Sequence, residues 1–185
     1  MLRPKSRALF LEEQKYLAPG LQSIALFSQI ALDSGKGCVL RDVDGNEYLD
    51  FVAGIGVASL GYSNPEYVRI MSKQLAKITV GSFTTAHRLN FAKTLARQTP
   101  KGLDRVQLYS SGAEAVESAM RLAKCYTGKW EFVSFWGGFH GKTLGTMGLL
   151  GDGQKQKYGP FAPGLHTLPA FPDCYRCPLK MKPDS

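Results

Sequence analysis

Hydrophobic and polar positions have two different spacings along this chain. Residues 39–43 and 47–51 mix apolar and β-prone positions on both sides of Asp44-Gly45-Asn46, a typical hairpin turn. Beyond Asn64-Pro65, a capped helix start, apolar residues recur at helical spacing. The residues expected to face a core from that helix are Val68, Met71, Leu75 and Ile78.

The second half of the chain alternates helical and strand patterns. The predicted helices are 87–98, 113–126 and 142–149, and the predicted strands are 105–109 and 131–135. Residues 1–34 form a mixed segment, and the chain after Gly151 is rich in glycine and proline and is expected to be loop. This alternation predicts an α/β fold with a doubly wound, mostly parallel sheet.

Composition agrees with a globular α/β protein. The 185 residues are 44% hydrophobic and 21% charged, enough for one domain with a proper core. No apolar run approaches the length that spans a bilayer, and the apolar run 8–11 ends at Glu12-Glu13, too short for a signal-peptide core. We therefore expect a cytoplasmic protein with no membrane partner.

The chain is basic, with 23 Lys and Arg against 15 Asp and Glu and a formal charge of +8. Such an excess attracts phosphates, carboxylates or nucleic acid. The basic residues are scattered, without a run or an aromatic-interleaved stripe, which disfavours nucleic-acid binding. An anionic cofactor or an acidic partner chain fits the charge equally well.

Four cysteines are present, and only Cys174 and Cys177 have the spacing of a metal or redox motif. Zinc usually needs four ligands, no second cysteine pair exists, and His166 is only a loose match for a third ligand. We interpret the motif as a loop with two free thiols and expect no metal. A disulfide between them is the alternative, although it is unexpected in the cytoplasm.

The first candidate site follows the predicted strand 105–109. Ser111 with Glu114 three residues later matches a capping box, so Ser111 is the expected N-cap of a helix. Gly112 and Ala113 then occupy the first helical positions, where backbone N–H groups have no intrahelical partner. A phosphate can approach those groups and the positive end of the helix dipole. An ordinary capped junction without a ligand is the competing interpretation.

The second candidate site follows the predicted strand 131–135. It offers Phe139 to cover a flat heterocycle, His140 to pack beside it and Lys142 to meet an anionic group. Ligands of open α/β sheets bind beyond the carboxyl ends of the strands, so both loops are expected at one edge. A core phenylalanine, a loop histidine and a solvated lysine are the alternatives for the residues taken singly.

Four motifs in order give the chain a family resemblance. They are Asp42-Val-Asp-Gly-Asn-Glu-Tyr-Leu-Asp-Phe51, Gly54-Ile-Gly-Val57, Ser111-Gly-Ala-Glu-Ala115 and Gly138-Phe-His-Gly-Lys-Thr143. Together they resemble the class III aminotransferases, fold-type I enzymes that use pyridoxal 5′-phosphate. That family includes 4-aminobutyrate, acetylornithine, ornithine and putrescine aminotransferases.

The resemblance implies roles for residues of this chain. The cofactor phosphate would be held by Ser111, Gly112 and Ala113. Phe139 would stack on the pyridine ring, and His140 would lie beside it. Ile55 and Gly56 would line the substrate entrance. The partners implied are an amino donor, a 2-oxo acid acceptor and a second subunit of a homodimer.

Lys142 would contact the substrate. Relatives that bind a substrate carboxylate usually carry arginine here, and lysine lacks its planar bidentate contact. With lysine at position 142, the chain resembles putrescine aminotransferase. The segment Cys174-Tyr-Arg-Cys-Pro178, in contrast, resembles a loop of some 4-aminobutyrate aminotransferases. The donor stays open among 4-aminobutyrate, a diamine and an ornithine-like amino acid.

The resemblance also sets an expected domain plan. Residues 1–60 would form an N-terminal segment with a β-hairpin, and residues 61–185 the first part of the cofactor-binding large domain. No lysine stands in the context of the Schiff-base lysine, so no catalytic residue is assigned. We expect a truncated product, or half of a split enzyme completed by a second chain. The alternative is a non-catalytic chain that binds the cofactor weakly or only assembles with a related subunit.

Overall fold

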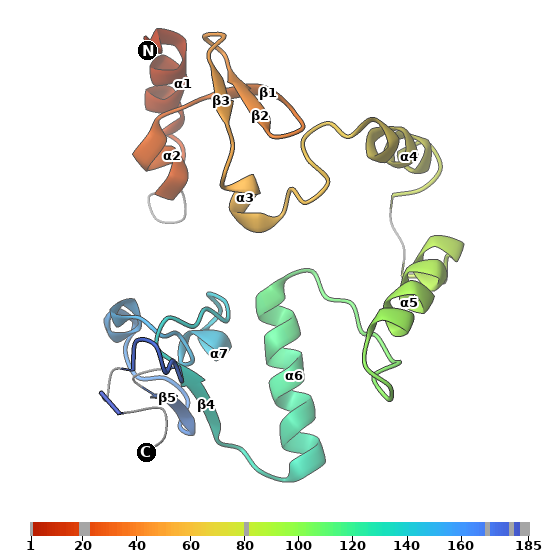
Figure 1. The fold of residues 1–185 in the computed structure, drawn as a ribbon, viewed down its shortest axis with the longest axis vertical. Helices are drawn as coiled ribbons and strands as arrows, with labels where there is room; N and C mark the ends of the chain where they lie inside the picture. The colour runs from red at the N-terminus through yellow and green to blue at the C-terminus, as the bar shows by residue number, and fades with distance from the viewer. Residues whose placement is uncertain (1, 19–22, 80–81, 169–170, 178–179, 182–185) are drawn as a thin grey trace. The chain divides into compact units, whose positions relative to one another are not determined.

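The computed structural model describes residues 2–18, 23–79, 82–168, 171–177 and 180–181 (Figure 1). The chain divides into two compact units, Met1–Thr85 and Ala86–Ser185. We describe each unit by itself. The expected segment boundary at residue 60 lies inside the first unit and stays a prediction.

The first unit contains two helices followed by a small antiparallel sheet. The helices are α1 (Pro4–Glu13) and α2 (Ser23–Ser28), and the strands are β1 (Leu32–Lys36), β2 (Val39–Asp42) and β3 (Glu47–Leu49), in the order β1-β2-β3. The predicted hairpin is confirmed, since Val39 pairs with Leu49 and Arg41 with Glu47. The sequence did not predict β1, because Leu-Asp-Ser-Gly-Lys lacks the alternation of a strand and is recruited by pairing with β2.

A buried carboxylate organises the hairpin turn. Asp42 is only 1% exposed, and it accepts hydrogen bonds from the backbone N–H groups of Asp44 and Asn46 at 3.0 and 2.8 Å. The side chains of Asn46 and Tyr48 donate to it at 2.8 and 2.7 Å. Burial disfavours the charged form, but these donors outweigh it and lower the pKa of Asp42 to about 2.

Two further segments complete the first unit, α3 (Ala53–Gly56) and α4 (Pro65–Leu75). The side chain of Asn64 accepts from two backbone N–H groups at the start of α4, which confirms the predicted cap. The prediction of a core-facing stripe on this helix is wrong. Val68, Met71, Leu75 and Ile78 are 49%, 39%, 59% and 55% exposed, because the described residues of this unit leave that face uncovered.

The second unit carries the α/β part of the chain. Its elements are α5 (Ala86–Gln98), α6 (Gly112–Thr127), β4 (Phe132–Phe135), α7 (Leu144–Met147), a 3₁₀ helix η1 (Gly153–Tyr158) and β5 (Leu165–Leu168). Strands β4 and β5 pair in parallel, with Phe132 opposite Leu165 and Phe135 opposite Leu168. The parallel sheet of the predicted fold class is therefore present. Helix α6 contacts α7, and Nζ of Lys124 on α6 lies 5.7 Å from the ring centroid of Phe132 on β4 (Figure 1).

Three sequence predictions for this unit need correction. Residues 105–109 do not form a strand, because no described segment supplies a hydrogen-bonded neighbour for them. The predicted helix 142–149 is shorter, with only Leu144–Met147 helical. The strand Leu165–Leu168 lies where a loop was predicted, because its pairing with β4 overrides the local glycine and proline content.

The expected proper core is also absent from the described residues. Only Leu149 and Leu150 are buried apolar residues there, while Phe27, Phe51 and Tyr126 are 95%, 89% and 90% exposed. The chain exposes 15398 Å². Two independent globules of half its mass each would together expose about 10,600 Å². Neither unit therefore covers its own apolar faces.

Candidate functional site

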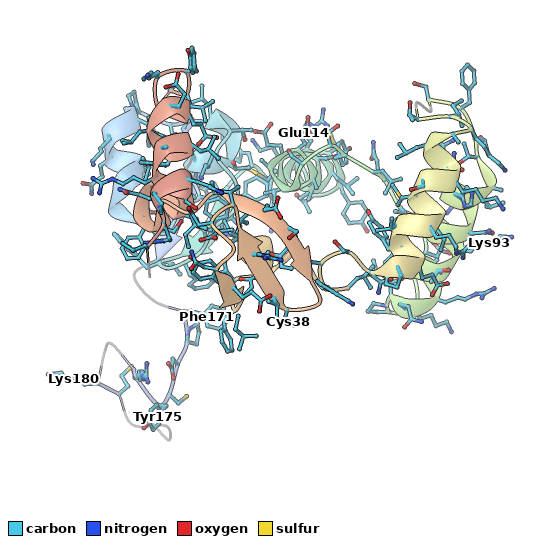
Figure 2. The ribbon with its side chains drawn as sticks, turned by 90° about the horizontal axis from the view of Figure 1, so that it is seen from above. Cys38, Lys93, Glu114, Phe171, Tyr175 and Lys180 are labelled. Atoms are coloured by element: carbon cyan, nitrogen blue, oxygen red, sulfur yellow. The ribbon has the colours of Figure 1, made fainter. Side chains whose placement is uncertain are left out.

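The start of α6 has the geometry that its sequence predicts. Ser111 is extended, with φ −144° and ψ 160°, and its Oγ accepts a hydrogen bond from the backbone N–H of Glu114 at 3.2 Å. Glu114 lies in the first turn, where a carboxylate complements the helix dipole (Figure 2). Ser111 is therefore confirmed as the N-cap, and its side chain is committed to capping.

The next residue leaves the helix start open. A Cβ added at Gly112 would meet no heavy atom within 4 Å. The first backbone N–H groups of a helix lack intrahelical acceptors and point outward, so an incoming acceptor can reach them here. The open volume at Gly112 is what an anion seat requires.

The second glycine-rich loop reaches this helix start through Gly141. A Cβ at Gly141 would lie only 2.6 Å from the Cβ of Ala113 and 2.7 Å from Oγ1 of Thr146. Gly141 also has φ +129°, a conformation that other residues rarely adopt. The lack of a side chain at this one position lets the loop pack directly on α6.

Two polar contacts fix the same junction from the other side. Thr143, which precedes α7, donates from its hydroxyl to Oε1 of Glu117 on α6. Its Oγ1 also lies 3.0 Å from Oγ1 of Thr146. The start of α7 and the second turn of α6 are therefore linked through hydroxyl and carboxylate groups.

The loop that leaves β4 is held by backbone hydrogen bonds. Gly137 donates its N–H to the carbonyl of Gly151 at 2.8 Å, and Gly151 donates back to the carbonyl of Gly138 at 2.9 Å. A Cβ at Gly151 would lie 2.2 Å from the carbonyl oxygen of Phe135. This close backbone packing sets the position from which Phe139 and His140 project.

These contacts shape a shallow pocket of about 400 Å³ that is open to solvent. Its described lining consists of Gly112, Ala113, Val116, Phe139, His140, Gly141 and Lys142. The volume lies within the usual range for small-molecule sites. Phe139 is 65% exposed, so a face of its ring is free, and Nζ of Lys142 lies 5.8 Å from its centroid.

The charge around the pocket favours an anion. None of its described lining residues carries a carboxylate, whereas Lys142 and the positive end of α6 both favour negative charge. The nearby carboxylate of Glu117 is engaged by Thr143. A ligand with a phosphate at Gly112 and a flat ring at Phe139 matches this arrangement.

The structure thus brings together five of the eight predicted site residues: Gly112, Ala113, Phe139, His140 and Lys142. Ser111 acts through its cap and does not line the pocket. Ile55 and Gly56 belong to α3 in the first unit, where Ile55 has the strained left-handed φ of 65°. Their role at a substrate entrance stays a prediction.

Sequence reasoning missed two lining residues, Val116 and Gly141. Val116 was detectable, because it stands four residues after Gly112 and so shares its helix face. Gly141 belongs to the motif at residues 138–143, but its close approach to Ala113 is a tertiary feature that one sequence does not show.

The cysteine motif lies apart from this pocket's lining. Cys174 and Cys177 are free thiols on either side of a turn, as the sequence interpretation has it, while Pro178 lies outside the described residues. Within the described ranges, no three metal-ligating side chains gather. Likewise, no described helix is both long and apolar enough to cross a membrane. The cytoplasmic location stays a prediction.

Comparison with known protein families tests whether the chain belongs to one of them. The profile described as "Aminotransferase class-III" matches residues 23–181, most of the chain and all of the pocket. The chain belongs to the class-III aminotransferase family. The cofactor of this family is pyridoxal 5′-phosphate, as the motifs led us to expect.

Individual relatives agree with the family profile. The chain is 36% identical over 180 residues to a diaminobutyrate--2-oxoglutarate aminotransferase of Rhizobium meliloti (strain 1021), covering 93% of this chain and 38% of the relative. It is 43% identical over 143 residues to an acetylornithine aminotransferase of Halalkalibacterium halodurans, covering 76% and 37%. The chain therefore spans less than two fifths of the length of these relatives.

Solved aminotransferase structures have the same fold. A Bacillus anthracis aminotransferase superposes with a TM-score of 0.78 at 27% identity, over 96% of this chain and 41% of that structure. An amine transaminase from an uncultivated Pseudomonas species, solved in a PLP-bound form, gives a TM-score of 0.72 at 25% identity, over 89% and 40%. The class-III chain thus has the fold-type I architecture expected from its motifs.

Proposed function

We propose that this chain supplies the phosphate-binding and ring-stacking part of a pyridoxal-phosphate-dependent aminotransferase. One observation carries the proposal: an open helix start and an exposed aromatic ring share one pocket of about 400 Å³. A phosphate and a flat heterocycle are the two ends of this cofactor. The family membership supplies the reaction class.

Four lining residues and the cap residue Ser111 have defined tasks in this proposal. The backbone N–H groups of Gly112 and Ala113 bind the phosphate, and Ser111 keeps the helix start in the shape that presents them. Phe139 stacks on the pyridine ring, and His140, half-buried against Gly138, closes the side of the ring.

The chemistry of the reaction belongs to the cofactor. When bound, pyridoxal phosphate supplies an aldehyde that links to amines and a pyridine ring that withdraws electrons from the donor carbon. This chain's residues contribute orientation: the phosphate seat fixes one end of the molecule, and Phe139 fixes the plane of its ring. Accurate positioning of reacting groups is a large part of catalytic rate enhancement.

The proposed reaction moves an amino group from an amine or amino acid to a 2-oxo acid. The relatives' names include diaminobutyrate, acetylornithine and 2-aminoadipate as amino compounds. Lys142 lies at the pocket edge and is exposed, so its ammonium group can meet a substrate carboxylate as a point charge. The donor remains within the class of 4-aminobutyrate, diamines and ornithine-like amino acids.

The second candidate function is a non-catalytic chain that assembles with a related subunit. The exposed apolar side chains of the described residues, such as Phe27, Phe51 and Phe83, favour it, because large uncovered apolar faces mark association surfaces. In either case we propose a second chain as partner, a second copy of the chain or one that completes it. Of these two, only a completing chain would supply the cofactor-linking lysine, because a second copy adds no lysine that this chain lacks, and Lys142 is the sole lysine among the described lining residues.

Cofactor titration of the 185-residue chain tests the proposal. Pyridoxal phosphate is compared with phosphate-free pyridoxal by isothermal titration calorimetry. We expect pyridoxal phosphate to bind at least tenfold more tightly, since charge-assisted hydrogen bonds to phosphate exceed about 1.4 kcal/mol together. Equal affinity of the two compounds would contradict a phosphate seat.

A matched pair of variants locates the seat. Gly112→Leu fills open space over the helix start, whereas Gly153→Leu fills open space on η1, away from the pocket lining. Neither glycine needs a positive φ, so both variants are expected to fold. Gly112→Leu should abolish the phosphate-dependent gain in affinity and Gly153→Leu should retain it. The assignment fails if the two variants behave alike.

To separate catalysis from binding, the chain is incubated with an amino donor, a 2-oxo acid and the cofactor, and transamination is measured. Borohydride treatment of a parallel sample shows whether a reducible Schiff base has formed. Under the first candidate function, turnover appears only after a lysine-bearing partner chain is added. Under the second, the partner binds but no turnover follows. Turnover by this chain alone would overturn the division of roles between the two chains.

A further inference from the structure

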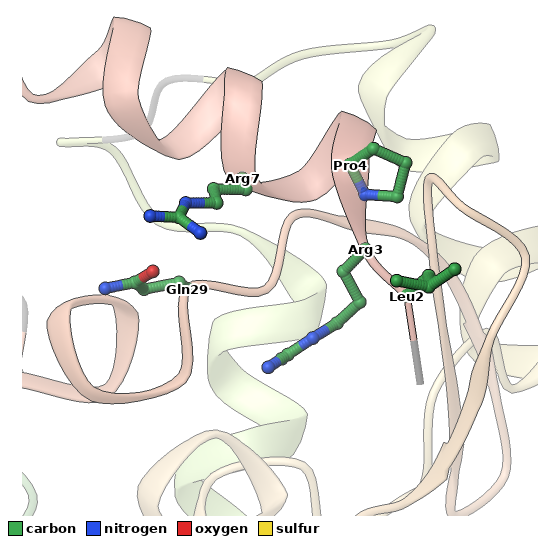
Figure 3. Close-up of a pocket in the computed structure, with 5 residues that line it drawn as sticks. All are labelled: Leu2, Arg3, Pro4, Arg7 and Gln29. Carbon is green, nitrogen blue, oxygen red and sulfur yellow. The ribbon is translucent and has the colours of Figure 1, made fainter.

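A second pocket lies in the first unit, beside the start of α1. It measures about 560 Å³, and its described lining consists of Leu2, Arg3, Pro4, Arg7 and Gln29 (Figure 3). None of the four motifs of the family resemblance contributes a lining residue. The pocket therefore needs an explanation beyond the proposed cofactor site.

The backbone places the two arginines one above the other. Arg7 donates its N–H to the carbonyl of Arg3 at 3.0 Å, so they lie one helical turn apart on one face. In the close-up, the guanidinium group of Arg7 and the amide of Gln29 point to the same side, and the side chain of Arg3, which also lines the pocket, extends below them (Figure 3).

Local contacts hold part of this arrangement in place. Nη1 of Arg3 donates to the carbonyl of Ser28 at 2.9 Å, which joins α1 to the end of α2. Gln29, the next residue, has φ +52°, an uncommon conformation for a residue with a side chain. Its N–H donates to the carbonyl of Ala25 at 2.9 Å. The backbone of Gln29 is thereby held next to the carbonyl that Arg3 contacts, while its side chain is exposed.

Neither arginine of the pocket forms an ion pair among the described residues. The described lining contains no carboxylate. Arg3 interacts with the neutral groups Ser28 carbonyl and Tyr48 hydroxyl. The nearby carboxylate of Asp44 is occupied by the backbone N–H groups of Lys5 and Ser6.

We propose that this pocket binds a small organic dianion, held between the guanidinium groups of Arg3 and Arg7 and the amide of Gln29. A guanidinium presents five donors in a planar fork that matches carboxylate and phosphate oxygens. Arg3 uses only part of this fork on Ser28, and the overall charge of +8 draws anions to the protein. Dicarboxylates and phosphate esters share the required chemistry.

Residue-resolved titration of the 185-residue chain tests this site. Succinate and inorganic phosphate are titrated separately at constant ionic strength, with acetate as a monoanion control, while NMR follows the backbone amides. We expect the amides of Arg7 and Gln29 to shift with either dianion at millimolar concentration and much less with acetate. A response to succinate alone assigns a dicarboxylate, and a response to phosphate alone assigns a phosphate ester. Unmoved amides overturn the proposal.

Two charge-matched variants on α1 complete the test. Arg7→Gln removes a lining guanidinium, whereas Lys5→Gln removes the same charge from an exposed residue outside the lining. Arg7→Gln should weaken dianion binding about tenfold, the effect of one lost charge-assisted contact, and Lys5→Gln less than about twofold. Equal weakening by both variants would mean that the net charge of the protein, and not the lining guanidinium, accounts for dianion binding, and would overturn the site.

The assignments of the two sites can be tested independently. Gly112→Leu should leave the Arg7 and Gln29 shifts unchanged, because Gly112 lines only the pocket at α6. Arg7→Gln should leave pyridoxal phosphate binding at Gly112 unchanged. Loss of both responses in either variant would contradict the assignment of two separate anion sites.

Discussion

The hairpin turn around Asp42 and the pocket at the start of α6 both gather polar groups, but they differ in whether those groups are already used. At Asp42, four donors of this chain converge on one buried carboxylate, and none is left for a ligand. At α6, the helix start faces open space at Gly112 and the ring of Phe139 is 65% exposed. The first arrangement is structural, whereas the second is built to receive something.

The comparison shows why charge alone does not identify a site. The pKa of Asp42 is lowered to about 2, yet the cause is a closed set of internal hydrogen bonds that outweighs burial. The α6 pocket offers no buried acid among its described lining. What marks it is unsatisfied donor capacity beside an uncovered aromatic ring.

The largest expected effect comes from closing the α6 pocket at Gly141. Gly141→Ala places a Cβ 2.6 Å from Ala113 in a backbone with φ +129°, so both overlap and strain oppose folding of the junction. We expect about 2–4 kcal/mol of destabilisation and loss of cofactor binding, measured by urea unfolding and calorimetry. Gly159→Ala is the control, with φ +79° but open space around it. Similar losses in both variants would contradict the role of close packing.

The hairpin should respond to acid, since the pKa of Asp42 is lowered from 3.8 to about 2. A lowered pKa adds stability above the ordinary value, and that stability is lost as the pH falls from about 4 through about 2. The hydrogen-exchange protection factors of the amides in β2 and β3, which correct for the intrinsic pH dependence of exchange, should therefore fall over this range. Burial disfavours the charged form of Asp44 in the same turn, but the backbone N–H groups of Ser6 and Lys5 outweigh it, so the pKa of Asp44 is also lowered. Asp42→Ala should therefore remove most of the pH response, leave the part that belongs to Asp44, and keep cofactor affinity at α6 intact. A pH response of undiminished size in Asp42→Ala would show that another group carries it.

A smaller effect is expected from the aromatic ring at the pocket. Phe139→Ala should weaken pyridoxal phosphate binding about two- to tenfold, the value of one aromatic stacking contact, while Phe139→Tyr should bind almost normally. Phe83→Ala is the control, because Phe83 is 82% exposed on the first unit. Equal binding of pyridoxal phosphate by the alanine and tyrosine variants at position 139 would contradict a stacking role for this ring.

The smallest effect concerns substrate choice rather than affinity for the cofactor. Lys142→Arg restores the planar fork that suits a carboxylate, so the complemented enzyme should shift several-fold toward 4-aminobutyrate and away from putrescine. The measurement is the ratio of kcat/KM for the two donors. An unchanged ratio would mean that Lys142 does not touch the substrate, and its place at the pocket edge would then serve the cofactor phosphate.

Sequence reasoning succeeded where a local signal decides the structure. The hairpin at Asp44-Gly45-Asn46 and the caps at Asn64 and Ser111 follow from turn and capping chemistry, and all three are confirmed. The glycine-rich loops were recognised from their motifs. The pairing of Gly141 with Ala113, which joins them into one pocket, depends on tertiary packing and was out of reach.

It failed where a structure depends on neighbours. β1 and β5 have weak local patterns and exist because β2 and β4 pair with them. Residues 105–109 have a good strand pattern but find no partner among the described segments. The apolar stripe of α4 likewise has the right spacing but remains exposed. Strand formation and burial are properties of contacts, so periodicity alone could not decide them.

The most direct test of the central claim is an amide and aromatic NMR titration of the 185-residue chain with pyridoxal phosphate. The account predicts that the amide protons of Gly112 and Ala113 move downfield on phosphate binding and that the ring protons of Phe139 shift with them. The amides of Asp44 and Asn46, which already serve Asp42, should stay unchanged. Unshifted amides at Gly112 and Ala113 under saturating pyridoxal phosphate would contradict the phosphate seat.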